Sequence, residues 1–184
     1  MCPNCQFTLA PLDKKFGTVP KMFRYLTDFA SYFTKKEQET LEKKIAKLER
    51  NFPGLHLSIV TVEVHHRFKP SEYLFWLMNR CYFTPMDSPM EKSFSIVLFF
   101  DSASRSVFLT TGYGLHSALP EEKLEAILEV ALPYYQRENF YTGTVSLLQE
   151  IKRHLRKYCS NGRTDTTAVK DAPKNQLKPA EELF

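Results

Sequence analysis

The chain has 184 residues, the common length of one domain with a single hydrophobic core, which argues against two independent catalytic domains. Hydrophobic residues make up 43% and charged residues 25%, so the chain is neither wholly disordered nor fibrous. The net charge of +4 comes from 25 basic and 21 acidic side chains, a mixed surface that does not indicate a nucleic-acid partner.

The hydrophobic runs of the sequence are short. The run over residues 96–100 is far below the length that crosses a bilayer, and the first residues lack the pattern of a secretory signal. We therefore expect a cytoplasmic protein with no membrane span.

The two ends of the chain differ from its centre. Residues 1–21 show no sustained hydrophobic period and carry Cys2 and Cys5 in a Cys-x-x-Cys motif, so we expect an extended arm or a small metal knuckle. Residues 159–184 mix both charges with few large apolar side chains, which predicts a flexible tail. The folded domain is then expected over residues 22–158.

The first elements of that domain follow from hydrophobic periodicity. Thr34 and Glu37 have the spacing of a capping box, and apolar residues at helical spacing follow them, which predicts a helix over 34–52. Apolar and β-branched residues between turn signals predict a strand over 56–64. A proline in a first turn and apolar residues at i, i+3, i+4 and i+7 predict a helix over 70–81.

The second half of the domain begins with an almost unbroken apolar run over residues 94–101, which predicts a buried strand. A short turn then predicts an antiparallel partner strand over 105–111. Pro120 with two following acids starts a third helix, which Pro133 kinks or stops, and a fourth helix is expected over 142–158. The element order predicts an α/β sandwich, with a small mixed sheet covered by helices on both faces.

Several stretches of this chain resemble the TPM domain family in their order and spacing, over about residues 22–158. They are Tyr25-Leu-Thr-Asp28-Phe-Ala, Leu48-Glu-Arg-Asn-Phe52, Leu57-Ser-Ile-Val-Thr-Val62, and Gly112-Tyr113-Gly114-Leu115 followed by Ala118-Leu-Pro. The resemblance implies a Rossmann-like sandwich. It also implies relatives that are mostly exported or membrane-anchored, of which some bind calcium or act as acid phosphatases and others serve the assembly or repair of protein complexes.

The resemblance further implies an acidic site, built in the family from a Thr-Asp, an Asp-Asn-Gly and a Glu. This chain keeps Asp28, but Ser93-Phe94-Ser95 stands at the Asp-Asn-Gly position and His116 at the Glu position. One carboxylate holds a hard divalent cation weakly, so calcium or magnesium is not expected here. Asp28 stays a candidate general base or weak metal ligand, and the alternative is a turn cap before Phe29.

The segment of Gly112, Tyr113, Gly114 and His116 is a candidate site for a ligand or a partner. It lies where a predicted strand ends and the chain turns toward a helix, a place where α/β folds bind ligands and where free N–H groups attract anions. The alternative is that the glycines adopt backbone conformations that other residues do not reach.

Cys2 and Cys5 have the spacing of half a zinc ribbon, so zinc is a candidate cofactor. The other two ligands can come from a second chain in a homodimer joined through the arm, from Cys81 and Cys159, or from histidines; a disulfide is the alternative. Cys81 ends a predicted apolar helix face and is expected to be a packed hydrophobe. The pair His65-His66 is expected to point to opposite faces of a strand. Trp76 is expected in the core or at an interface.

These observations predict a non-catalytic interaction or complex-assembly module with a protein partner. The alternative function is a metal-dependent acid phosphatase that uses Asp28 and the Gly112–His116 region.

Overall fold

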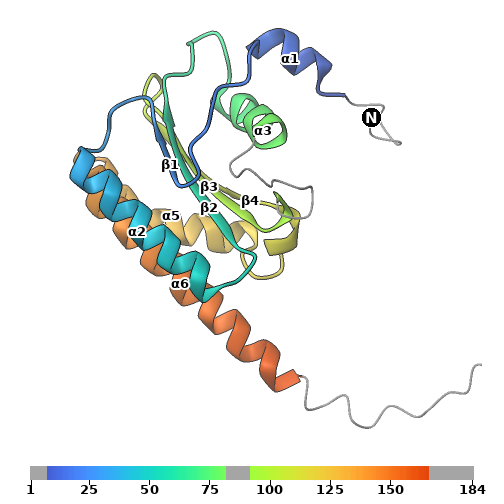
Figure 1. Ribbon diagram of the computed structural model, residues 1–184, viewed down its shortest axis with the longest axis vertical. Coiled ribbons are helices and arrows are strands. Elements are labelled where there is room, and N and C mark those ends of the chain that lie inside the picture. The colour runs from blue at the N-terminus through green and yellow to red at the C-terminus, as the bar shows by residue number, and fades with distance from the viewer. Residues whose placement is uncertain (1–7, 82–91, 166–184) are drawn as a thin grey trace, which may run out of the picture.

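A four-stranded sheet forms the centre of the protein in a computed structural model that describes residues 8–81 and 92–165 (Figure 1). The strands lie in the order β1 (Leu26–Asp28), β2 (His56–Val62), β3 (Ser95–Asp101) and β4 (Ser106–Thr111). The first three strands are parallel, and β4 pairs with β3 in the antiparallel direction. The predicted mixed sheet is therefore confirmed.

Three helices cover one face of the sheet: α2 (Lys35–Asn51), α5 (Glu121–Tyr135) and α6 (Phe140–Asp165). The capping box that starts α2 is present, since the Thr34 backbone N–H donates to Glu37 at 2.8 Å and the Glu37 N–H donates back to the Thr34 hydroxyl. Figure 1 shows α2 and α6 side by side, and the two helices are in contact. Their apolar stripes and that of α5 form one core.

Two shorter helices, α1 (Ala10–Phe16) and α3 (Pro70–Arg80), cover the opposite face. Trp76 of α3 is completely buried at the centre of this second core, as expected. Because helices lie on both faces, every residue of β3 is buried, which explains its unbroken apolar run. The predicted sandwich is confirmed.

Two elements were not predicted. The strand β1 has three residues, too few to show an alternating pattern, and it forms because its backbone pairs with β2. The helix α1 lies within the predicted arm, where residues 10–16 are helical rather than extended. Seven residues are too short for a stable isolated helix, so α1 depends on contacts with α3.

The bounds of two helices differ from those that the sequence predicts. The third helix continues through Pro133 to Tyr135, which costs little because Pro133 removes one backbone N–H donor close to the end of the helix. The fourth helix begins at Phe140 and extends to Asp165, into the predicted tail. Within the described residues, no helix combines the length and hydrophobicity needed to cross a membrane.

Candidate functional site

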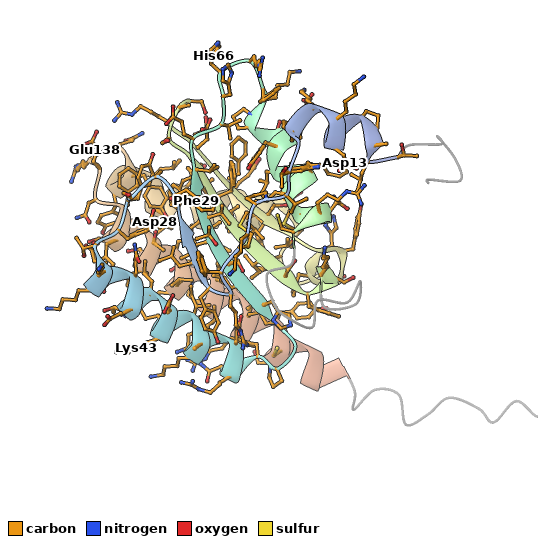
Figure 2. The ribbon with its side chains drawn as sticks, turned by 45° about the horizontal axis from the view of Figure 1, so that its top comes forward. Asp13, Asp28, Phe29, Lys43, His66 and Glu138 are labelled. Atoms are coloured by element: carbon orange, nitrogen blue, oxygen red, sulfur yellow. The ribbon has the colours of Figure 1, made fainter. Side chains whose placement is uncertain are left out.

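Asp28 ends β1, beside the half-exposed ring of Phe29 (Figure 2). Its Oδ1 accepts hydrogen bonds from the Tyr32 backbone N–H at 2.9 Å and from the Thr61 hydroxyl at 2.5 Å. Its Oδ2 accepts from the Phe33 backbone N–H at 3.0 Å and from the Gln38 side-chain amide at 3.1 Å. Both oxygens are therefore used to hold the turn between β1 and α2.

This geometry supports the turn cap over the catalytic or metal-binding alternative for Asp28. A base or a cation ligand needs an oxygen lone pair that faces an open site, and here each oxygen already accepts two bonds. In the part of the chain that the structure describes, no three His, Cys, Asp or Glu side chains gather where a metal could bind.

The structure does not bring Asp28 and the Gly112–His116 segment into one site. Asp28 lies in register with Thr61 at the carboxyl ends of the parallel strands, whereas Gly112 follows β4 at the opposite end of the sheet, beside Ser95. With about 3.3 Å per residue and about 4.8 Å between strands, the separation is on the order of 20 Å. A phosphatase site made from both segments has no geometric support.

The glycines of the turn serve close packing. A Cβ on Gly112 would lie 2.1 Å from the carbonyl oxygen of Lys92, and a Cβ on Gly114 would lie 2.8 Å from the ring of Phe94. Neither glycine has a positive φ, so the expectation that they adopt conformations closed to other residues is wrong. They are needed because the turn passes directly over the chain that enters β3.

Most amide groups of this turn already donate hydrogen bonds. The N–H of Gly112 donates to Ser95 at 2.9 Å, that of Leu115 to Gly112 at 3.1 Å and that of His116 to Tyr113 at 3.2 Å. The turn itself is only a three-residue 3₁₀ helix, η1 (Tyr113–Leu115). An anion site made from these amides is therefore not supported.

Two side chains of the turn stand in solvent. Tyr113 is 93% exposed, the largest exposure among the exposed large hydrophobic residues, and His116 is exposed as well. The side chain of Tyr113 does not serve to pack the fold, because it is not buried under a helix. Both side chains are therefore accessible to a partner at this end of β4.

A groove of about 760 Å³ begins at this turn and follows β4. Its floor is β4, one wall is α3 and the other wall is α5, and residues of the Gly112–His116 turn and of the segment before β3 complete the lining. The groove is lined by Phe75 and Met78 of α3, by Leu109 of β4, and by Leu124, Glu125 and Leu128 of α5. Sequence reasoning found the turn and missed the groove.

The α3 wall of the groove is apolar and partly exposed, since Phe75 is 48% exposed and Met78 is half-buried. The α5 wall combines half-buried Leu124 and Leu128 with an exposed carboxylate, Glu125. Met78 also packs against the core that α3 covers, and Leu124 and Leu128 pack against the core that α5 covers, so these side chains lie at the margins of the two cores. In the sequence they belong to the apolar stripes of their helices, so no local signal distinguishes them from core residues.

Two of the four cysteines, Cys81 and Cys159, lie within the described residues. Cys2 and Cys5 lie outside the described residues, so zinc at that motif stays a prediction. Cys81 is buried as expected, and burial raises the pKa of its thiol to about 12. Cys159 is exposed on α6, which covers the opposite face from α3, so Cys81 and Cys159 do not complete a zinc site.

The two adjacent histidines do not lie on a strand. The strand β2 ends at Val62, and the rings of His65 and His66 lie against each other in the following loop, with centroids 4.1 Å apart and a tilt of 32°. Burial is the main cause that lowers the pKa of His65, and the neighbouring His66 lowers it further. The expectation that the two side chains point to opposite faces of a strand is therefore wrong.

Similar folds occur among solved structures. The N-terminal domain of a protein from P. gingivalis has a TM-score of 0.60 at 18% identity, with 73% of this chain and 83% of that one covered. The BA42 protein from Bizionia argentinensis has a TM-score of 0.60 at 12% identity, covering 71% and 86%. The N-terminal domain of cg2496 from Corynebacterium glutamicum has a TM-score of 0.54 at 8% identity, covering 90% and 94%.

These likenesses show the fold alone, because all three identities are low. No match is found among curated proteins. The family model described as the TPM domain matches residues 26–154, which is most of the chain and nearly the whole sandwich. The resemblance in the sequence is thereby confirmed, and the chain belongs to the TPM domain family.

Proposed function

We propose that this chain is a non-catalytic interaction module, which binds a protein partner through the groove along β4 and the Gly112–His116 turn. The observation that carries the proposal is the position of Tyr113, which is 93% exposed at the mouth of a groove with apolar walls. A tyrosine offers a large contact area and loses little side-chain entropy on binding. An exposed aromatic next to an apolar groove is typical of a protein-binding surface.

The rigidity of the groove supports the same proposal. Its floor is a strand of the central sheet, and its walls are helices whose inner faces are packed in the two cores. The close contact of Gly112 with Lys92 fixes the turn against β3. A rigid surface loses little entropy when a partner binds, which favours affinity.

Tyr113→Ala tests this proposal. Because Tyr113 packs against no core, the melting temperature should stay within about 2 °C of that of the unsubstituted protein. A partner captured from the source cell and then purified should bind the variant at least about tenfold more weakly, as expected for an aromatic anchor. The measurements are thermal unfolding and a binding titration with the purified partner.

Phe29→Ala is the matched control, since Phe29 is a 52% exposed aromatic at the opposite end of the sheet. It should leave the affinity for the partner unchanged. A partner that binds the Tyr113 variant with full affinity, or that loses affinity only with the Phe29 variant, would place the binding surface elsewhere.

A further inference from the structure

We propose that the partner segment is an extended peptide that pairs with the outer edge of β4 as a fifth strand, and that this peptide carries Lys or Arg on the side facing α5. This inference rests on the proposed function and specifies its mode of binding. It follows from three features: which residues of β4 direct their backbone N–H and C=O groups away from β3, the side chains on the two walls of the groove, and the charge of α5.

In the sheet order β1-β2-β3-β4, no described residue pairs with the outer side of β4. The bond from the Gly112 N–H to Ser95 fixes the alternation of the antiparallel ladder with β3. In that alternation Phe108 directs its N–H and C=O toward β3, whereas Val107, Leu109 and Thr111 direct theirs outward.

These outward groups lie on the floor of the groove, between α3 and α5. An extended chain fits between the helices, whereas a second folded domain would meet both helices before its own edge reached β4. A second copy pairing through β4 would also place its acidic α5 near the acidic α5 of this copy, and the like charges would repel. The recessed edge therefore favours a peptide over another copy of this chain.

The walls determine the side chains of that peptide. Successive residues of a strand point to opposite faces, so alternate side chains of the peptide face α3 and α5. Those facing α3 meet the half-buried side chain of Met78, which favours large apolar groups. Those facing α5 meet Leu124 and Leu128 at the base of the wall and carboxylates at its rim.

The charge of the α5 rim favours a cation. Glu121 and Glu125 are one helical turn apart, both are exposed, and neither forms an ion pair with a residue of the described ranges. A Lys or Arg can lay its aliphatic stem over Leu124 and place its charged end beside these carboxylates. The carboxylate pair and the apolar base thus match the two parts of one basic side chain.

The first part of the test selects peptides. Random eight-residue peptides displayed on phage are selected against the full chain, and the survivors should alternate large apolar residues with residues that include Lys or Arg. A selected peptide made by synthesis should bind the double variant Glu121→Lys, Glu125→Lys at least tenfold more weakly. The double variant Glu122→Lys, Glu129→Lys is the matched control, because it makes the same charge change on α5 outside the groove lining and should bind normally.

The second part tests strand pairing directly. In the free protein, amide hydrogen exchange should be fast at Val107, Leu109 and Thr111 and slow at Phe108. Saturating peptide should slow exchange at Leu109 at least tenfold and leave Phe108 almost unchanged. Two further peptides carry N-methyl groups on either the odd-numbered or the even-numbered residues. Only the peptide whose methyl groups replace the N–H donors that face β4 should lose binding, and the other should bind normally. This comparison requires no substitution in the protein.

Several results overturn strand addition: no enrichment of peptides, survivors with helical spacing or acidic side chains, or equal effects of both methylation phases. Protection of Leu109 in the free protein also overturns it. Such protection means that another part of this chain covers the edge if it is independent of concentration, and that a second copy does so if it grows with concentration. If strand addition fails while Tyr113→Ala still weakens partner binding, the proposed function stands with another mode of binding; if both fail, the proposed function falls too.

Discussion

At the scale of single residues, the two aspartates that end strands use their carboxylates to build turns. Asp28 holds the turn that leads into α2, and Asp101 accepts the backbone N–H groups of Val64 at 2.8 Å and Ala103 at 3.1 Å. A sequence can predict such a cap from an aspartate at a strand end. It could not predict that the Thr61 hydroxyl is one of the hydrogen-bond donors to Asp28, because that contact depends on the pairing of β1 with β2.

The turn-cap role of Asp28 predicts a loss of stability in Asp28→Asn. An asparagine keeps the shape but replaces one accepting oxygen by a donor that faces other donors, so the free energy of unfolding should fall by about 1–3 kcal/mol. Urea unfolding followed by circular dichroism measures this change. Glu129→Gln, at an exposed position of α5, should stay within about 0.5 kcal/mol.

Asp28→Asn should keep full partner binding at temperatures where the variant is folded, since Asp28 and the groove lie at opposite ends of the sheet. An undiminished free energy of unfolding combined with lost binding or lost catalysis would show that Asp28 acts in a site rather than in a turn.

At the scale of elements, the long periodic segments were predictable and the short ones were not. The helix α2 combines a capping box with an apolar stripe, and β3 is an apolar run, so each carries its own signal. The helix α1 depends on a partner: Phe16 packs against Trp76, and Asp13 accepts a hydrogen bond from the Trp76 indole at 2.9 Å. No window of sequence shows that residues 60 positions apart will meet, which is why α1 was assigned to an arm.

The contact between α1 and α3 predicts a pH dependence. Hydrogen bonds from Arg80 and then from Trp76 lower the pKa of Asp13 below its usual 3.8. A lowered folded-state pKa means that the ionised carboxylate stabilises the fold above the usual pKa, and that this stabilisation disappears as the pH falls through the lowered value. The difference in unfolding free energy between the protein and Asp13→Asn should therefore be constant above about pH 5 and shrink below about pH 4.

Fluorescence of Trp76 provides the measurement, because this is the only tryptophan in the chain and it touches Asp13 directly. Denaturant titrations at several pH values give the difference between the two proteins. A difference that grows with acidification, or that is absent at pH 7, would show that the Asp13 carboxylate does not join α1 to α3.

At the scale of the whole molecule, the sandwich was predictable because each predicted helix had one apolar face, the central strand was apolar on both faces, and the strand–helix–strand order favours parallel pairing. The groove was not, because it is formed by residues of α3, β4, η1 and α5 that are distant in sequence. The turn at Gly112 carried the only local signal for this surface. The sequence correctly indicated that the glycines of this turn matter. Glycine is needed at position 112 because the Lys92 carbonyl oxygen leaves no room for a Cβ.

The Cys-x-x-Cys motif gives a prediction about assembly. If Cys2 and Cys5 bind zinc, protein purified without chelator should contain zinc that is lost in the double variant Cys2→Ser, Cys5→Ser and kept in Cys159→Ser. About half a zinc per chain would indicate four thiolates shared by two chains, since buried Cys81 is unsuited as a ligand. Elemental analysis measures the metal, and its absence from protein with reduced thiols would refute the zinc site.

The central claim is that function lies at the groove end of the sheet rather than at the Asp28 end. Photo-crosslinking in the source cell tests it most directly, with benzoylphenylalanine placed at position 113 in one protein and at position 29 in another; both positions are exposed aromatics at opposite ends of the sheet. We expect a discrete cross-linked protein from position 113 and none from position 29. A cross-link from position 29 alone would contradict it.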